Sequence, residues 1–168
     1  MSNFNIAYER MISNEGGYKL TSVANDRGGQ TYAGISRNRW PDWAGWKDID
    51  QGMTPASELV RAFYKQNFWF PIQGDHIDAQ AIASNLFDFA VNAGPKTAIK
   101  LAQIVVGVTP DGVLGNRTLS ALNSIDRSMF VAYYALAKIT RYRDIVTKDR
   151  SQSKFLLGWI NRTLREAV

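Results

Sequence analysis

Between residues 54 and 166 the apolar side chains recur with the period of an α-helix, in one run after another. This spacing is typical of amphipathic helices that each pack one face against a core. Proline and glycine interrupt the pattern at Pro71, Gly94, Pro95 and Gly107, which predicts separate helices. Because the chain has no cysteine, such a fold must be stable through packing alone.

The predicted helices of this part of the chain begin at capping residues or prolines and end at breakers. They run from Thr54 to Pro71, from Asp78 to Ala93, from Pro95 to Val106, from Asn116 to Asn123, from Asp126 to about Lys148, and from Ser151 or Ser153 to Glu166. The segment 40–52 is expected to form loops with one short helical turn.

The first helix is predicted from Phe4 onward, with Ser2 or Asn3 as its cap. Glu15 returns to within roughly 20° of the apolar stripe that Phe4 begins, because each helical residue turns about 100°. Gly16 and Gly17 end the helix. Residues 18–35 then alternate in short pieces around a glycine-rich turn, which favours a small antiparallel sheet or hairpin.

A chain of 168 residues suits one compact domain with a sizeable core. We therefore expect a mainly α (α+β) fold with a small β-hairpin or sheet near the N-terminus. The break at Gly94 and Pro95 is the one internal boundary that the pattern indicates, and it divides the chain into residues 1–94 and 95–168.

Composition excludes several kinds of chemistry. The chain has no cysteine and a single histidine, His76, so a thiol nucleophile and a typical catalytic zinc site are ruled out, and we expect neither metal nor cofactor. The net charge of +5 favours an anionic partner: nucleic acid, lipid headgroups or a cell wall bearing carboxylates. The N-terminus lacks the pattern of a secretory signal, and the nearly apolar run 129–137 is too short to span a bilayer.

Two carboxylates near the N-terminus are candidates for acid–base chemistry. Burial beside the core would raise the pKa of Glu15 and keep it a proton donor, whereas Asp26 in a polar turn would stay ionised. Glycoside hydrolysis needs such a pair, and Thr31 could hold the attacking water. The residues alone leave open that Glu15 is a capping or salt-bridged residue instead.

Three separated motifs carry a resemblance to a known family: EGGY at 15–18, DRGGQTYAGIS at 26–36 and DFAVNAG at 88–94. Their order and spacing resemble glycoside hydrolase family 108, the phage and bacterial N-acetylmuramidases. The resemblance implies a lysozyme-like fold in which a small β element forms one wall of a cleft. It also implies Glu15, Asp26 and Thr31 as catalytic residues, although the gap between Glu15 and Asp26 is longer than in phage lysozymes.

The resemblance extends to residues expected to contact substrate. Asp88 and Asn92 would border the cleft, and Tyr18 and Tyr32 would stack against sugar rings. For the first pair the alternative is an internal polar network that ties the helix to the β wall, and for the tyrosines it is core packing. The trio Trp40, Trp43 and Trp46 is either a sugar platform or a cluster that closes the underside of the domain.

The second half of the chain is similar to the peptidoglycan-binding unit that follows the catalytic half in this family. The matching residues are Gln103, Gly107, Asp111, Gly112, Gly115 and Thr118. Whether this unit binds glycan or only packs is left open. The basic side chains of the last third are expected to form a solvated face that suits an anionic wall: Arg141, Arg143, Lys148, Arg150, Lys154, Arg162 and Arg165.

The resemblance implies an enzyme that hydrolyses the β-1,4 bond between N-acetylmuramic acid and N-acetylglucosamine in bacterial peptidoglycan. Because no secretory signal is visible, we expect a phage endolysin, with a bacterial effector delivered by a secretion system as the alternative. Such an enzyme would be a monomer without nucleic-acid partners or stable membrane insertion. It would be made in the host cytoplasm without a signal peptide and would act on the wall after release. A lytic transglycosylase, a noncatalytic wall-binding module and a basic helical nucleic-acid binder remain the alternatives.

Overall fold

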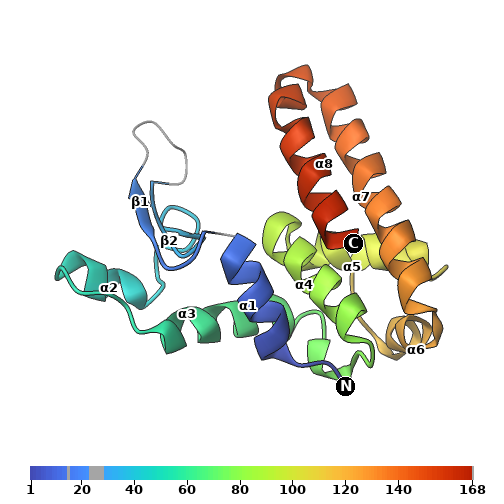
Figure 1. Ribbon diagram of the computed structural model, residues 1–168, viewed down its shortest axis with the longest axis horizontal. Helices are drawn as coiled ribbons and strands as arrows, with labels where there is room; N and C mark the ends of the chain where they lie inside the picture. Colours follow the sequence, from blue (N-terminus) through green and yellow to red (C-terminus); the bar gives the residue numbers. More distant parts are fainter. Residues whose placement is uncertain (15, 23–28, 168) are drawn as a thin grey trace.

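The computed structural model describes residues 1–14, 16–22 and 29–167 (Figure 1). In these ranges the chain is mainly α-helical, with one three-stranded antiparallel sheet near the N-terminus. The expected mainly α (α+β) fold with a small β element near the N-terminus is therefore confirmed. No described helix is long and apolar enough to cross a membrane.

Helix α1 (Phe4–Asn14) forms as the apolar spacing predicts. The side-chain oxygen of Asn3 accepts a hydrogen bond from the Asn5 N–H at 2.8 Å, so Asn3 caps the helix. Gly16 and Gly17 have φ values of +84° and +78°, and the Gly17 N–H donates to the Ile12 carbonyl at 3.0 Å. One face of the helix is buried: Phe4, Ala7, Tyr8, Met11 and Ile12.

The small sheet follows α1 and has the strand order β1-β2-β3, with both pairs antiparallel. Its strands are β1 (Leu20–Ser22), β2 (Gln30–Tyr32) and β3 (Ile35–Ser36). Ala33, in the β2–β3 turn, is buried and has a φ of +49°. The buried Tyr64 hydroxyl donates to the Ala33 carbonyl at 2.8 Å, which ties this turn to the helices beneath it.

The segment that follows the sheet contains α2 (Gly45–Asp50), α3 (Ser57–Tyr64), a π-helical turn η1 (Lys65–Trp69) and a 3₁₀ turn η2 (Gly74–His76). The predicted helix to Pro71 thus changes its hydrogen bonding at Lys65, and the Phe70 N–H donates to the Lys65 carbonyl at 2.9 Å. The Asn67 side chain donates to the Phe63 carbonyl at 2.8 Å, so that carbonyl stays satisfied within the changed pattern.

The remaining helices are α4 (Gln80–Ala93), α5 (Pro95–Val105), α6 (Asn116–Ser124), α7 (Arg127–Lys148) and α8 (Ser153–Ala167), with a 3₁₀ turn η3 (Arg150–Gln152) before α8. Asp126 caps α7 as predicted, since its carboxylate accepts from the Met129 N–H at 2.9 Å. The predicted cap of α4 was wrong: Asp78 precedes the cap position at Ala79, and its own N–H donates to the Asn123 side chain.

Helix α4 is the centre of the molecule, because every residue from Ile82 to Ala90 is buried. It packs against α1 on one side and against α5 and α7 on the other. Figure 1 shows α7 and α8 side by side at one end of the molecule and the sheet at the opposite end, with α1 and α4 between them.

The loop between α5 and α6 is held by one buried side chain. Gln103 donates to the Asp111 carboxylate at 2.8 Å, to the Val113 carbonyl at 3.0 Å and to the Thr118 hydroxyl at 3.1 Å, and its own oxygen accepts from the Gly112 N–H. Gln103 is only 1% exposed. Several residues of the peptidoglycan-binding resemblance therefore shape this loop from within.

The Tyr64 hydroxyl bond gives a test of how the sheet is held. Tyr64→Phe leaves a buried carbonyl without this donor, so we expect it to lower the free energy of unfolding by about 1–2 kcal/mol. Urea unfolding measures the change. Tyr133→Phe, at a tyrosine that is 52% exposed, is the matched control and should change stability little. Equal stability of both variants would contradict this role of Tyr64.

Candidate functional site

The predicted catalytic set is only partly within the described residues. Glu15 and Asp26 lie outside them. Thr31 is half-buried in the central strand β2, where it pairs with Thr21 of β1 and Ser36 of β3. The catalytic roles of these three residues stay predictions.

A tyrosine pair joins the residues on either side of the first helix end. The hydroxyls of the buried Tyr8 and the exposed Tyr18 lie 2.9 Å apart. Burial, and next the hydrogen bond to Tyr18, raise the pKa of Tyr8 well above its ordinary value. Tyr8 therefore keeps its proton at neutral pH, and the pair ties the segment that follows the two glycines to α1. Tyr18, at 41% exposed, retains ring surface that a ligand could contact.

Tyr32 has a different environment, because it belongs to the core. It is 4% exposed, and its ring stacks on Trp43 with centroids 6.0 Å apart and an interplanar angle of 20°. Packing, which the sequence left open as its alternative role, accounts for this side chain. Asn92 is exposed near the C-terminal end of α4, and its contact with substrate stays a prediction.

Asp88 lies in a buried polar cluster at the centre of the molecule. Its two carboxylate oxygens accept from the Nε and Nη2 atoms of Arg162 in α8, each at 3.1 Å, and the Asn14 side chain lies 3.5 Å away. Asp88 is 5% exposed. The internal network suggested by the sequence is thus present, but it ties α4 to α8 rather than to the β wall.

The cluster continues to Glu166 and Lys138. Arg162 Nε also lies 3.3 Å from Glu166 Oε1, and Lys138 Nζ donates to Glu166 Oε2. Lys138 is 1% exposed, with its ammonium over the rings of Phe89 and Tyr134. Arg162 was expected on a solvated face; it is instead half-buried because it neutralises these carboxylates.

Sequence reasoning missed Lys138, although a signal was present. Every fourth residue from Phe130 through Tyr134 and Lys138 to Tyr142 lies on the buried face of α7. A lysine in phase with three aromatic residues requires a buried carboxylate, because an unpaired ammonium in the core is costly.

Burial and the neighbouring charges shift the pKa values of the cluster in opposite directions. Burial, followed by the hydrogen bond and the charge of Asp88, raises the pKa of Glu166 to about 7. Burial also works against ionisation of Asp88, but the hydrogen bond to Glu166 and the charge of Arg162 outweigh it and lower the pKa of Asp88. Burial lowers the pKa of Lys138. Below neutral pH, Glu166 is therefore mainly protonated.

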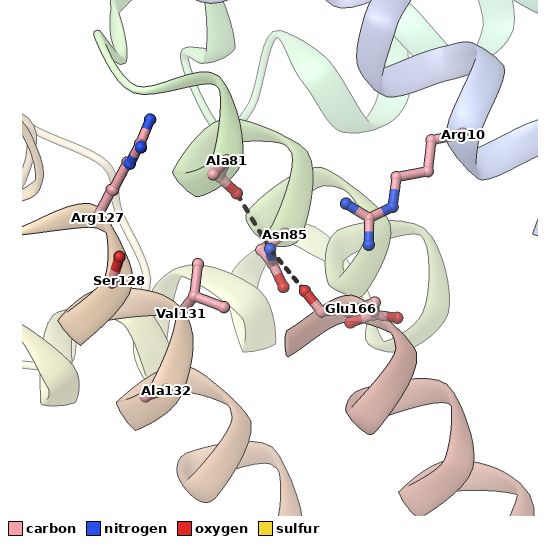
Figure 2. Close-up of a pocket in the computed structure, with 8 residues that line it drawn as sticks. All are labelled: Arg10, Ala81, Asn85, Arg127, Ser128, Val131, Ala132 and Glu166. Carbon is pink, nitrogen blue, oxygen red and sulfur yellow. Dashed lines mark hydrogen bonds between the residues drawn. The ribbon is translucent and has the colours of Figure 1, made fainter. Parts of the chain in front are cut away.

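A pocket of about 250 Å³ opens beside this cluster, between α1, α4, α7 and α8 (Figure 2). Asn85 donates to the carbonyls of Ala81 at 3.1 Å and Glu166 at 3.3 Å. Arg10 reaches across from α1 and donates to the Arg165 carbonyl at 3.2 Å. The end of α8 is thus hydrogen-bonded to both α1 and α4.

Comparison with known families gives two matches along the chain. Residues 8–94 match the model "Glycosyl hydrolase 108", and residues 97–164 match "Predicted Peptidoglycan domain". Together these matches define a glycoside hydrolase that acts on peptidoglycan. Because the first match spans slightly more than half of the chain, the protein belongs to the glycosyl hydrolase 108 family.

A solved structure with a similar fold is described as "Structure of Brucella abortus SagA". It is 27% identical to this chain, and the match covers 98% of this chain and 91% of that one with a TM-score of 0.74. The likeness therefore extends over both halves of the molecule. No curated protein matches the sequence.

The raised pKa of Glu166 predicts a pH-dependent stability. Because its folded pKa of about 7 lies above the ordinary 4.5, the stabilisation from its protonation is fully present below pH 4.5 and is lost as the pH rises through 7. The free energy of unfolding of the wild type should fall relative to Glu166→Gln between about pH 5 and about pH 8, with a slope of at most about 1.4 kcal/mol per pH unit.

Urea unfolding at several pH values in this window measures the difference. The exposed Glu58 on α3 provides the control, and Glu58→Gln should keep the wild-type pH dependence. If the free energies of unfolding of wild type and Glu166→Gln had the same pH dependence, protonation of Glu166 would not stabilise the fold.

Proposed function

We propose that this protein is an N-acetylmuramidase that hydrolyses the β-1,4 bond between N-acetylmuramic acid and N-acetylglucosamine in bacterial peptidoglycan. The observation that carries the proposal is the family match over residues 8–94, which includes all three sequence motifs. Helix α1, which precedes the first motif, buries the apolar stripe that the sequence predicts, and this agreement supports the proposal.

In the proposed mechanism Glu15 is the general acid that protonates the glycosidic oxygen. A carboxyl group at the end of a half-buried helix is one whose pKa desolvation can raise, as this role requires. Asp26 stabilises the positive charge of the transition state or, with Thr31, orients the attacking water. Carboxyl groups about 5–5.5 Å apart would give retention of configuration, and those about 6.5–9.5 Å apart would give inversion.

We propose that residues 1–94 form the catalytic region and that residues 95–168 form a helical peptidoglycan-binding region packed on it as one body. The packing of α4 against α5 and α7 supports the proposal that the two regions form one body, as does the Asp88–Arg162 pair. The exposed cations Arg143, Lys148 and Lys154 would attract the carboxylates of the wall.

The biological role that we propose is that of a phage endolysin. It would be made in the host cytoplasm, act as a monomer on the wall in the periplasm after release, and need neither nucleic acid nor membrane insertion. The proposal includes Tyr18 and Asn92 as substrate contacts, because both side chains are exposed. Asp88 and Tyr32 would support the site from the interior, since both are buried.

Digestion of purified peptidoglycan tests the activity and its general acid. Wild type and Glu15→Gln are compared, and the products are reduced with borohydride and analysed by mass spectrometry. We expect reducing N-acetylmuramic acid ends from the wild type and a loss of about 100-fold or more in Glu15→Gln. The control Glu58→Gln should retain wild-type activity.

Other products would identify the alternatives. Anhydromuramic ends would indicate a lytic transglycosylase, reducing glucosamine ends a glucosaminidase, and an intact polymer a noncatalytic module. Full activity in Glu15→Gln would exclude this residue as the general acid.

The roles of Asp26 and Thr31 are tested by two further substitutions. Asp26→Asn should lower turnover by about 100-fold or more with the fold intact. Thr31→Val should lower it by roughly tenfold, which is the loss of about one hydrogen bond. The exposed Glu58 again provides the control, and Glu58→Gln should keep its activity. Initial rates on labelled peptidoglycan give the comparison, and an unchanged rate would remove the substituted residue from the mechanism.

A further inference from the structure

A second pocket lies on the catalytic region, between the segment that joins β3 to α2 and the helices α3 and η1. Its volume is about 260 Å³. It is lined by Arg39, Trp40, Pro41, Asp42, Trp43, Phe63 and Asn67. None of these residues has a part in the mechanism proposed above.

The walls of this pocket are aromatic rings that are fixed before any ligand binds. Trp40 is perpendicular to Phe63, with ring centroids 4.9 Å apart, and Trp43 is perpendicular to Trp46 at 5.1 Å. The indole of Trp43 also covers Gly45 so closely that a Cβ there would lie 2.2 Å from the ring. The two indoles that line the pocket are partly exposed, whereas Trp46 is buried and donates to the Trp40 carbonyl.

The rim of the pocket carries polar groups that the rest of the described chain does not use. Arg39 and Asp42 are exposed and form no hydrogen bond or ion pair with any described residue. Their opposite charges cancel, so the rim offers a donor and an acceptor without a net charge. Such a rim suits a neutral polar ligand better than an anionic one.

The third polar group is placed by the π-helical turn. Asn67 uses its amide nitrogen to satisfy the Phe63 carbonyl at 2.8 Å, which leaves its amide oxygen available to the pocket. Insertions of this kind into α-helices occur frequently at functional sites. The change of hydrogen bonding at Lys65 thus brings an acceptor to the edge of an aromatic surface.

We propose that this pocket is a secondary binding site for a neutral N-acetylhexosamine unit of a glycan strand. The apolar face of a pyranose ring can pack on the indoles of Trp40 and Trp43, while its hydroxyl and acetamido groups bond to the polar rim. The pocket is smaller than a typical site for a drug-sized ligand, and this size suits a single sugar ring. The choice of ligand rests on the proposed function, because peptidoglycan repeats such a unit along every strand.

The test uses tri-N-acetylchitotriose as a neutral probe and the Glu15→Gln chain, in which hydrolysis cannot consume the ligand. Assigned indole N–H signals are followed by NMR during the titration. We expect the Trp40 and Trp43 signals to shift and that of the fully buried Trp69 to stay in place. Adding Arg39→Ala and Asp42→Ala together should weaken the binding that these two signals report by about tenfold, with an unchanged circular dichroism spectrum.

The matched control is Glu58→Ala, at an exposed carboxylate of α3 that does not line the pocket, which should bind as tightly as the parent at these two signals. Unmoved Trp40 and Trp43 signals, or equal affinity at these signals after the double substitution, would overturn the proposal. Failure of the muramidase proposal can be distinguished from failure of this one. The first would appear as undigested peptidoglycan in the assay with the wild type, whereas the binding site is tested by titration of the Glu15→Gln variant, in which no hydrolysis is needed.

Discussion

The buried ion cluster of Asp88, Arg162, Glu166 and Lys138 is the interaction on which the arrangement of the helices depends. Two carboxyl groups and two cations have been taken out of water, at a cost of several kcal/mol per ion. That cost is offset only if each charge keeps its partners. Asp88 keeps Arg162 as a partner through two charge-assisted hydrogen bonds of 3.1 Å. The four residues come from α4, α7 and α8, so each of these helices supplies a partner to the cluster.

The cluster also contacts the end of α1, and two tyrosine hydroxyls hold described residues that come later in the chain. The Asn14 side chain, at the end of α1, lies 3.5 Å from the same Asp88 carboxylate. The Tyr8 hydroxyl holds Tyr18, and the Tyr64 hydroxyl holds the turn at Ala33. The residues that flank the predicted general acid along the chain, Asn14 and Tyr18, are thus each held by a side-chain hydrogen bond. A region resembling a peptidoglycan-binding unit contributes to that support through Arg162.

Much of this fold could be predicted from local signals, because helix period and capping are read within a few residues. The helices from α4 to α8, the caps at Asn3 and Asp126 and the small sheet all follow from such signals. The partners of charged side chains could not be predicted in this way. Arg162 has the same local sequence signal as an exposed arginine, and only the fold brings Asp88, far away along the chain, within reach. The π-helical turn at Lys65 was missed for a related reason, since no period marks an inserted residue.

A double-mutant cycle between Asp88 and Arg162 tests most directly whether the ion cluster joins the two regions. The variants Asp88→Leu, Arg162→Leu and the pair are unfolded in urea at neutral pH. Arg162→Leu leaves the buried Asp88 without its guanidinium partner and should cost about 3–5 kcal/mol. Asp88→Leu should cost less, because Arg162 is half-buried and keeps its contact with Glu166, and the pair should cost less than the sum of the two single substitutions. A coupling of about 2 kcal/mol or more is the predicted result. Additive effects of the two substitutions would contradict the account, because they would show that the contact between α4 and α8 is not what holds these helices together.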